Sequence, residues 1–236
     1  MLVYLRFERI VGEMSKHCCG GNNFDNRGAP LSGRYRLILW IALIVNGGMF
    51  LIEVVAGLAA DSVSLQADAL DFLGDASNYG ISLFVFSMAL RVRAKAALFK
   101  GLVMALFGVW VLGTAVFNAL LGTVPGAVTM GVVGTIALFA NAAIFAMLWA
   151  YRYGDSNMRS VWLCTRNDVI GNFAVLAAAV GVFGTGTGWP DFIVASIMAS
   201  LALQSAWVIV RQALMEIRQA DDGISPPSAE IRPVKQ

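Results

Sequence analysis

The stretch QADALDFLGD, residues 66–75, places three aspartates inside a long apolar part of the chain. Spacings of three and four residues put Asp68, Asp71 and Asp75 on one face of a helix. Because a carboxylate in hydrocarbon costs at least ~2.5–3.5 kcal/mol on insertion scales, such a face must point into the interior of a helix bundle. The three aspartates are therefore candidate functional residues, although a water-filled vestibule or a helix-packing network would also explain them.

The composition around this stretch excludes an ordinary water-soluble domain. Of the 236 residues, 58% are hydrophobic and 14% are charged, against roughly 45–50% and 25% in soluble proteins. About 20 apolar residues cross the ~30 Å hydrocarbon core, and these long apolar runs lack the alternation of β-barrel strands. We therefore predict an all-α integral membrane protein, a bundle of six transmembrane helices at residues 37–59, 64–90, 98–122, 127–151, 160–183 and 189–212.

The segments outside these spans are polar. Residues 1–36 are expected to form a largely disordered N-terminal tail and residues 213–236 a short C-terminal tail, with one six-helix transmembrane domain at 37–212 between them. The start of translation, Met1 or Met14, is left open by the sequence. We see no cleavable signal peptide, so the first span is expected to act as its own insertion signal.

Lysine and arginine predict the orientation, because they favour the cytoplasmic side of a membrane. They gather before the first span, around the second and fourth connections and after the sixth span, whereas connections one, three and five have none. Both tails are therefore expected to be cytoplasmic, in a multi-pass protein of the cell (inner) membrane. A formal net charge of +2 is too small to indicate a nucleic-acid partner. Three cysteines, two of them adjacent, predict no disulfide framework.

The fifth span carries a second polar pair, Cys164 and Asp168, at positions i and i+4. If this pair faces Asp71 and Asp75, four ionisable side chains surround one point, which suits a tetrahedral divalent cation such as zinc. A bound cation would also relieve the repulsion between clustered carboxylates. The sole histidine, His17, lies in the N-terminal tail, so the aspartates would have to exchange protons for the metal.

The run SVSLQADALD, residues 62–71, together with Asp75, six spans and the pair in the fifth span, resembles the cation diffusion facilitator family. The resemblance covers residues 37–212. It implies a transport domain that exports zinc, cadmium, cobalt, iron or manganese from the cytoplasm, usually against protons. Carried over position by position, it implies that Asp71, Asp75, Cys164 and Asp168 bind the metal between the second and fifth helices.

Two of the chain's departures from this family bear on its metal preference and its assembly. Cys164 stands where the family usually has His or Asp, and a softer ligand favours zinc or cadmium over manganese. Many relatives have a soluble cytoplasmic C-terminal domain that forms dimers, which we expect to be missing here. A homodimer is therefore left open. The expected partners are membrane lipid, the metal cation and the proton, and the metal is a substrate, so no cofactor is expected.

Further polar residues are candidates for supporting the metal ligands or for lining the ion route. They are Asp68, Asn78 and Asn172, each about one turn from a candidate ligand, and Asn46 and Glu53 on one face of the first span. Helix-packing hydrogen bonds, or snorkelling of Glu53 to water, are the alternatives. Asp191 lies near the start of the sixth span and is expected to cap the N-terminus of that helix. The tail cluster His17, Cys18 and Cys19 could collect soft metal ions.

Two other functions remain open at this stage. The first is a metal-binding membrane subunit or sensor that does not transport, in which the ion only holds the bundle together. The second is an intramembrane aspartyl enzyme, with Asp75 and Asp168 as an acid/base dyad. Asp75 follows Leu73-Gly74 and therefore lacks the glycine-x-glycine-aspartate signature of intramembrane aspartyl proteases. We therefore predict a transporter and not an enzyme.

Overall fold

A computed structural model describes residues 33–85, 88–149 and 156–221, without the side chains of 85, 90, 156–164 and 221. These residues are helical almost throughout and contain no strand. The helices are α2 (Gly33–Ala59), α3 (Val63–Gly80), α4 (Leu90–Leu121), α5 (Ala127–Leu148), α6 (Ser156–Thr185) and α7 (Trp189–Asp221). A short π-helix, η1 (Ile81–Val85), continues α3. The tail cluster His17, Cys18 and Cys19 and both candidate start residues lie outside the described residues.

Local sequence signals explain where α3 begins and where α4 ends. Ser62 has extended backbone angles and caps α3, because its side chain accepts a hydrogen bond from the Leu65 backbone N–H. Gly122 ends α4 in the left-handed conformation, with φ 68°, which glycine adopts without a steric penalty. Its backbone N–H bonds the carbonyls of Asn118 and Ala119, which would otherwise lack partners at the helix end.

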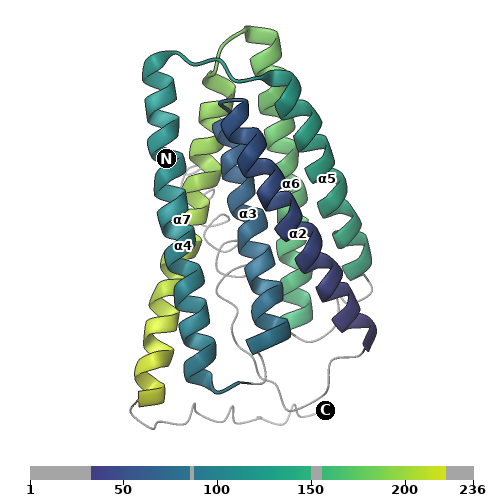
Figure 1. Cartoon of the computed structure of the whole chain (residues 1–236), viewed down its shortest axis with the longest axis vertical. Helices are drawn as coiled ribbons and strands as arrows, with labels where there is room; N and C mark the ends of the chain where they lie inside the picture. Colours follow the sequence, from purple (N-terminus) through teal and green to yellow (C-terminus); the bar gives the residue numbers. More distant parts are fainter. Residues whose placement is uncertain (1–32, 86–87, 150–155, 222–236) are drawn as a thin grey trace, which may run out of the picture.

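Helix α3 lies in the middle of an elongated bundle (Figure 1). It packs against α2, α4, α6 and α7, and α4 also runs along α7 while α5 runs along α6. Most of the α3 side chains are buried, including polar ones such as Gln66 and Asp68. The aspartate-bearing helix is therefore the one that the other helices enclose.

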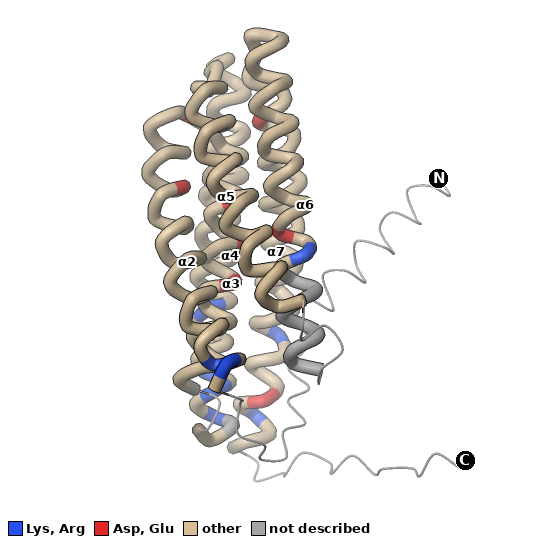
Figure 2. Tube along the Cα trace, turned by 90° about the vertical axis from the view of Figure 1, so that its right-hand side faces the viewer, with Lys and Arg blue, Asp and Glu red and all other residues tan. Residues whose placement is uncertain are grey.

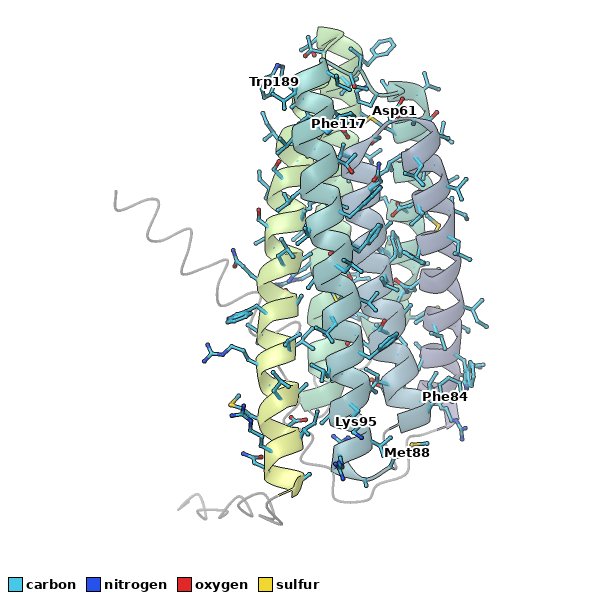
Figure 3. All side chains as sticks on the ribbon, turned by 60° about the vertical axis from the view of Figure 1, so that its left-hand side comes forward. Asp61, Phe84, Met88, Lys95, Phe117 and Trp189 are labelled. Carbon is cyan, nitrogen blue, oxygen red and sulfur yellow. The ribbon has the colours of Figure 1, made fainter. Side chains whose placement is uncertain are left out.

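The outer surface of the bundle is apolar. Large side chains such as Leu120 and Phe183 are 82% and 80% exposed, and hydrophobic sticks project outward along most of the length in Figure 3. By length and composition, α2, α4, α5, α6 and α7 are each suited to cross a membrane. The enclosed α3 carries three aspartates and completes the bundle, so the predicted all-α membrane fold is confirmed.

The helix ends differ from the predicted spans where charged residues follow apolar ones. Helix α4 begins at Leu90 and not near residue 98, so Arg91, Arg93 and Lys95 lie within its first turns. Helix α7 continues to Asp221, beyond the apolar run that ends near residue 212. Hydropathy locates the hydrocarbon boundary, whereas backbone hydrogen bonding continues past it because Lys, Arg and Glu are good helix formers.

Lysine and arginine gather toward one end of the bundle in the described part of the chain (Figure 2). This is the end at which α2 begins, α4 begins and α7 ends (Figure 1). The opposite end carries Asp61, Phe117 and Trp189 (Figure 3). We call the first the basic end and the second the Asp61 end.

Candidate metal centre

The first determinant of the site is how α3 is held at the Asp61 end. Asp191, in the first turn of α7, is fully buried. Its Oδ2 accepts a hydrogen bond from the Val63 N–H at 2.8 Å, and its Oδ1 accepts bonds from Ser64 N–H at 3.0 Å and Ser62 Oγ at 2.9 Å. The expectation that Asp191 caps its own helix is therefore corrected: its carboxylate caps the neighbouring helix α3, because the free N–H groups of α3 face it across the interface.

Asp75 is the aspartate of α3 that meets α6. Its side chain is buried, and its carboxyl lies within hydrogen-bonding reach of the Asp168 carboxyl. Tyr79, one turn further along α3, donates a hydrogen bond from its hydroxyl to Asp75 Oδ2 at 3.1 Å. The same hydroxyl lies 3.2 Å from Thr165 Oγ1 of α6. Two carboxyls from separate helices thus come together in the interior of the bundle.

Asp71 lies one turn from Asp75 toward the Asp61 end and also faces α6. A Cβ placed on Gly171 would lie 4.0 Å from Asp71 Oδ2. Asp71 interacts electrostatically with both Asp68 and Asp75. Cys164 belongs to α6, one turn before Asp168, but its side chain lies outside the described residues. The structure therefore brings Asp71, Asp75 and Asp168 to the α3–α6 interface, and that they bind a metal together with Cys164 stays a prediction.

Among the side chains that the structure describes, no group of three or more His, Cys, Asp or Glu residues is arranged to hold a metal ion. The described acids therefore meet in pairs. The donor set that the structure describes consists of two to three carboxylates, which are oxygen ligands for a divalent cation. The four-ligand set stays a prediction.

A buried cation accompanies Asp75 on the side of the basic end. Lys100 of α4 is 6% exposed, and its Nζ donates a hydrogen bond to Asn78 Oδ1. Its positive charge also acts on the Asp75 carboxyl. Asn78, predicted to support the ligands or line the route, therefore connects this lysine to α3. The burial of Lys100 is a finding of the tertiary structure.

A second polar group lies toward the Asp61 end. Asn172 of α6 donates from Nδ2 to both carboxylate oxygens of Asp68, at 2.9 Å each. Asn141 of α5 donates to Asn172 Oδ1 at 3.3 Å. Glu53 of α2 is fully buried, and its carboxyl lies within hydrogen-bonding reach of Asp68. Glu53 therefore does not snorkel to water.

Asn46 is buried on the same face of α2 as Glu53, as predicted. Its Nδ2 donates to the Ala42 carbonyl one turn earlier at 2.8 Å. Its observed hydrogen bond is therefore within its own helix.

Sequence reasoning missed several residues of these networks, among them Tyr79, Asn141, Lys100 and Thr165. Tyr79 follows Asp75 at i+4, the spacing at which helical side chains touch, so it could have been found. Asn141 is a single amide in an apolar span, which is a recognisable signal. For Lys100 no signal separated a buried lysine from an interfacial one, because it stands close to Arg91, Arg93 and Lys95 in the sequence.

The fold and this arrangement define a polytopic helical membrane protein whose interior carries acidic pairs between helices. Residues 39–217 match the family described as the cation efflux transmembrane domain. The chain therefore belongs to the cation efflux family, also called the cation diffusion facilitators.

Curated relatives agree with this assignment. The chain is 23% identical over 220 residues to a cadmium, cobalt and zinc/H(+)-K(+) antiporter of Bacillus velezensis, covering 86% of this chain and 68% of the relative. It is 26% identical over 188 residues to the metal cation efflux system protein CzcD of Cupriavidus metallidurans, covering 75% and 60%. It is 24% identical over 223 residues to the zinc transporter ZitB of Escherichia coli, covering 88% and 69%. The chain thus spans 60 to 69% of the length of these three relatives.

Proposed function

We propose that this protein is a proton-coupled antiporter that exports divalent transition-metal cations from the cytoplasm. Zn²⁺ and Cd²⁺ are the preferred substrates, and Co²⁺, Fe²⁺ and Mn²⁺ are weaker ones. The metal is the transported substrate, so the activity needs no cofactor and no catalysed chemical step. The observation that carries the proposal is the meeting of the Asp75 and Asp168 carboxyls between α3 and α6.

The proposed metal site consists of Asp71, Asp75, Cys164 and Asp168. Carboxylates and thiolates bind a divalent cation only when deprotonated, so binding of the metal releases protons and uptake of protons releases the metal. A site with this chemistry exchanges its two substrates. Alternating access then requires the α3–α6 interface to open toward each side of the membrane in turn.

The proposal includes the orientation and the assembly. The gathering of Lys and Arg at the end where α2 begins and α7 ends supports cytoplasmic termini in a multi-pass cell (inner) membrane protein. The homodimer that the sequence leaves open is the second part of the proposal. Labelling of single introduced cysteines from either side of the membrane tests the orientation. Cross-linking in native membranes tests the homodimer.

The experiment is metal flux in liposomes that contain the purified full-length chain, with an imposed pH gradient. Zn²⁺ or Cd²⁺ is expected to move in exchange for protons. Asp75→Ala and Asp168→Ala are each expected to lower that flux to the level of empty liposomes. Glu216→Gln is the matched control, because Glu216 lies near the end of α7, where Gln212 donates a hydrogen bond to it, and it is expected to retain full flux.

Full flux in both aspartate variants would contradict the site. Tight metal binding without any flux in the wild type would instead favour the non-transporting metal-binding subunit. The two outcomes are separable, because binding and flux are measured on the same preparation.

A further inference from the structure

Glu53 and Asp68 form an acidic pair outside the proposed metal site, and only one of the two carboxyls receives hydrogen bonds from a described donor. Glu53 is fully buried, and neither of its carboxyl oxygens receives a hydrogen bond from a donor among the described residues. The group against which it lies is the carboxyl of Asp68. Two ionised carboxylates have acceptors only and repel each other, so a contact between them requires a proton.

Asn172 identifies which carboxyl keeps the charge. Its Nδ2 donates to both oxygens of Asp68 at 2.9 Å, and these bonds stabilise Asp68 as the ionised member of the pair. Glu53 receives no comparable donor among the described residues. A proton shared by the pair would therefore reside on Glu53 and be donated to the Asp68 carboxylate.

The surroundings of the pair contain no compensating cation among the contacts that the structure describes. From α3, Asp71 is the further titratable group that acts on Glu53, and its effect is repulsive. From α6 and α5, Asn172 and Asn141 contribute uncharged amides. The one buried lysine of the described chain, Lys100, acts on Asp75.

We propose that Glu53 and Asp68 form a proton-binding site of their own, separate from the metal ligands, in which one shared proton joins α2 to α3. This inference rests on the proposed antiport. Loss of the proton leaves two adjacent buried anions and separates the two helices, whereas its uptake restores their packing. Proton occupancy at the pair thus controls the packing of α2 on α3.

The first test observes the proton in the wild-type protein. Infrared spectra of the full chain in lipid, with ¹³C-labelled glutamate, are recorded at pH 7. A glutamate in water has a pKa of about 4.3 and is ionised at this pH. A ¹³C-shifted band of a protonated carboxyl is expected, and it should disappear in Glu53→Gln. Absence of that band in the wild type, or its persistence in Glu53→Gln, overturns the proposal.

The second test separates proton coupling from metal binding. The double variant Glu53→Gln/Asp68→Asn keeps the size and hydrogen-bonding capacity of the pair but cannot titrate. Its Zn²⁺ affinity is expected to stay within about threefold of the wild type, which corresponds to less than ~1 kcal/mol. Its stimulation of Zn²⁺ flux by a pH gradient should fall to about onefold. Asp61→Asn, an exposed acid at the same end of the bundle, should retain the wild-type stimulation.

The outcomes distinguish this inference from the proposed function. A wild type that moves no metal defeats the antiport itself. A wild type that exchanges metal for protons, with a double variant that does so equally, defeats the Glu53–Asp68 site alone. If the double variant does not fold, the infrared spectrum of the wild type alone tests whether Glu53 holds the proton.

Discussion

The carboxylate of Asp191 accepts a hydrogen bond from the backbone N–H of Val63 at 2.8 Å, although 128 residues separate them in sequence. Together with its bonds to Ser62 and Ser64, this contact fixes the N-terminus of α3 against α7. The aspartates of α3 follow within the next few turns. The register of the candidate metal ligands relative to the bundle is therefore set in part by a residue that is not a ligand.

Asp191→Ala should destabilise the fold. The substitution leaves buried N–H groups of α3 without an acceptor, and each such loss costs about 1–3 kcal/mol. We expect a loss of roughly 2–3 kcal/mol for the cap as a whole. Thermal unfolding in detergent would show this as a midpoint lower by several degrees. Asp191→Asn keeps one acceptor oxygen and should lose less; an unchanged midpoint in Asp191→Ala would show that the cap is not needed.

Lys100→Met should raise the affinity for a divalent cation. The positive charge of Lys100 acts on Asp75 and opposes a second cation in the same region. Its removal is expected to strengthen Zn²⁺ binding about fivefold, or roughly 1 kcal/mol at the effective dielectric constant of a protein interior. Lys100→Arg keeps the charge and is the control. Calorimetric titration measures both, and weaker binding in Lys100→Met would mean that the lysine supports the site and does not oppose the ion.

Cys164→Ser should change ion preference more than stability. A thiolate selects soft cations, whereas a hydroxyl does not, so the preference for Cd²⁺ over Mn²⁺ should fall by about tenfold or more. Competition between the two ions for flux in proteoliposomes gives the ratio. The unfolding midpoint serves as the control and is expected to stay within a few degrees. An unchanged ratio would remove Cys164 from the metal ligands.

Gly101→Ala should weaken the packing of α4 on α7. A Cβ at this position would lie 2.8 Å from Val210 Cγ2 and 3.1 Å from Ile209 Cγ2, both on β-branched side chains that move little. Overpacking of this kind costs about 1–3 kcal/mol. Gly113→Ala on the same helix meets nothing within 4 Å and is the matched control. Equal unfolding midpoints for the two variants would contradict the close approach of α4 and α7.

The membrane class and the inward orientation of the aspartates could be predicted from the sequence. Each depends on a local rule: the length of apolar runs, the cost of a carboxylate in hydrocarbon, and the spacing of three and four residues on a helix. The expectation that Asp75 and Asp168 face each other came from the same spacing together with a family resemblance, and their binding of a metal stays a prediction. The start of α4 at Leu90 and the end of α7 at Asp221 could not be predicted in this way. Hydropathy indicates where the hydrocarbon core ends, and the helical backbone continues beyond that point.

The sequence by itself determined that this chain forms a helical membrane bundle with an acidic interior, because apolar length and buried charge leave no other arrangement. Only the tertiary structure decided which polar groups touch: Asp191 with the start of α3, Lys100 with Asn78, and Glu53 with Asp68. These contacts join residues on different helices. They depend on how the helices are rotated and shifted against one another, and that geometry is fixed by packing of the whole bundle and not by any single stretch of sequence.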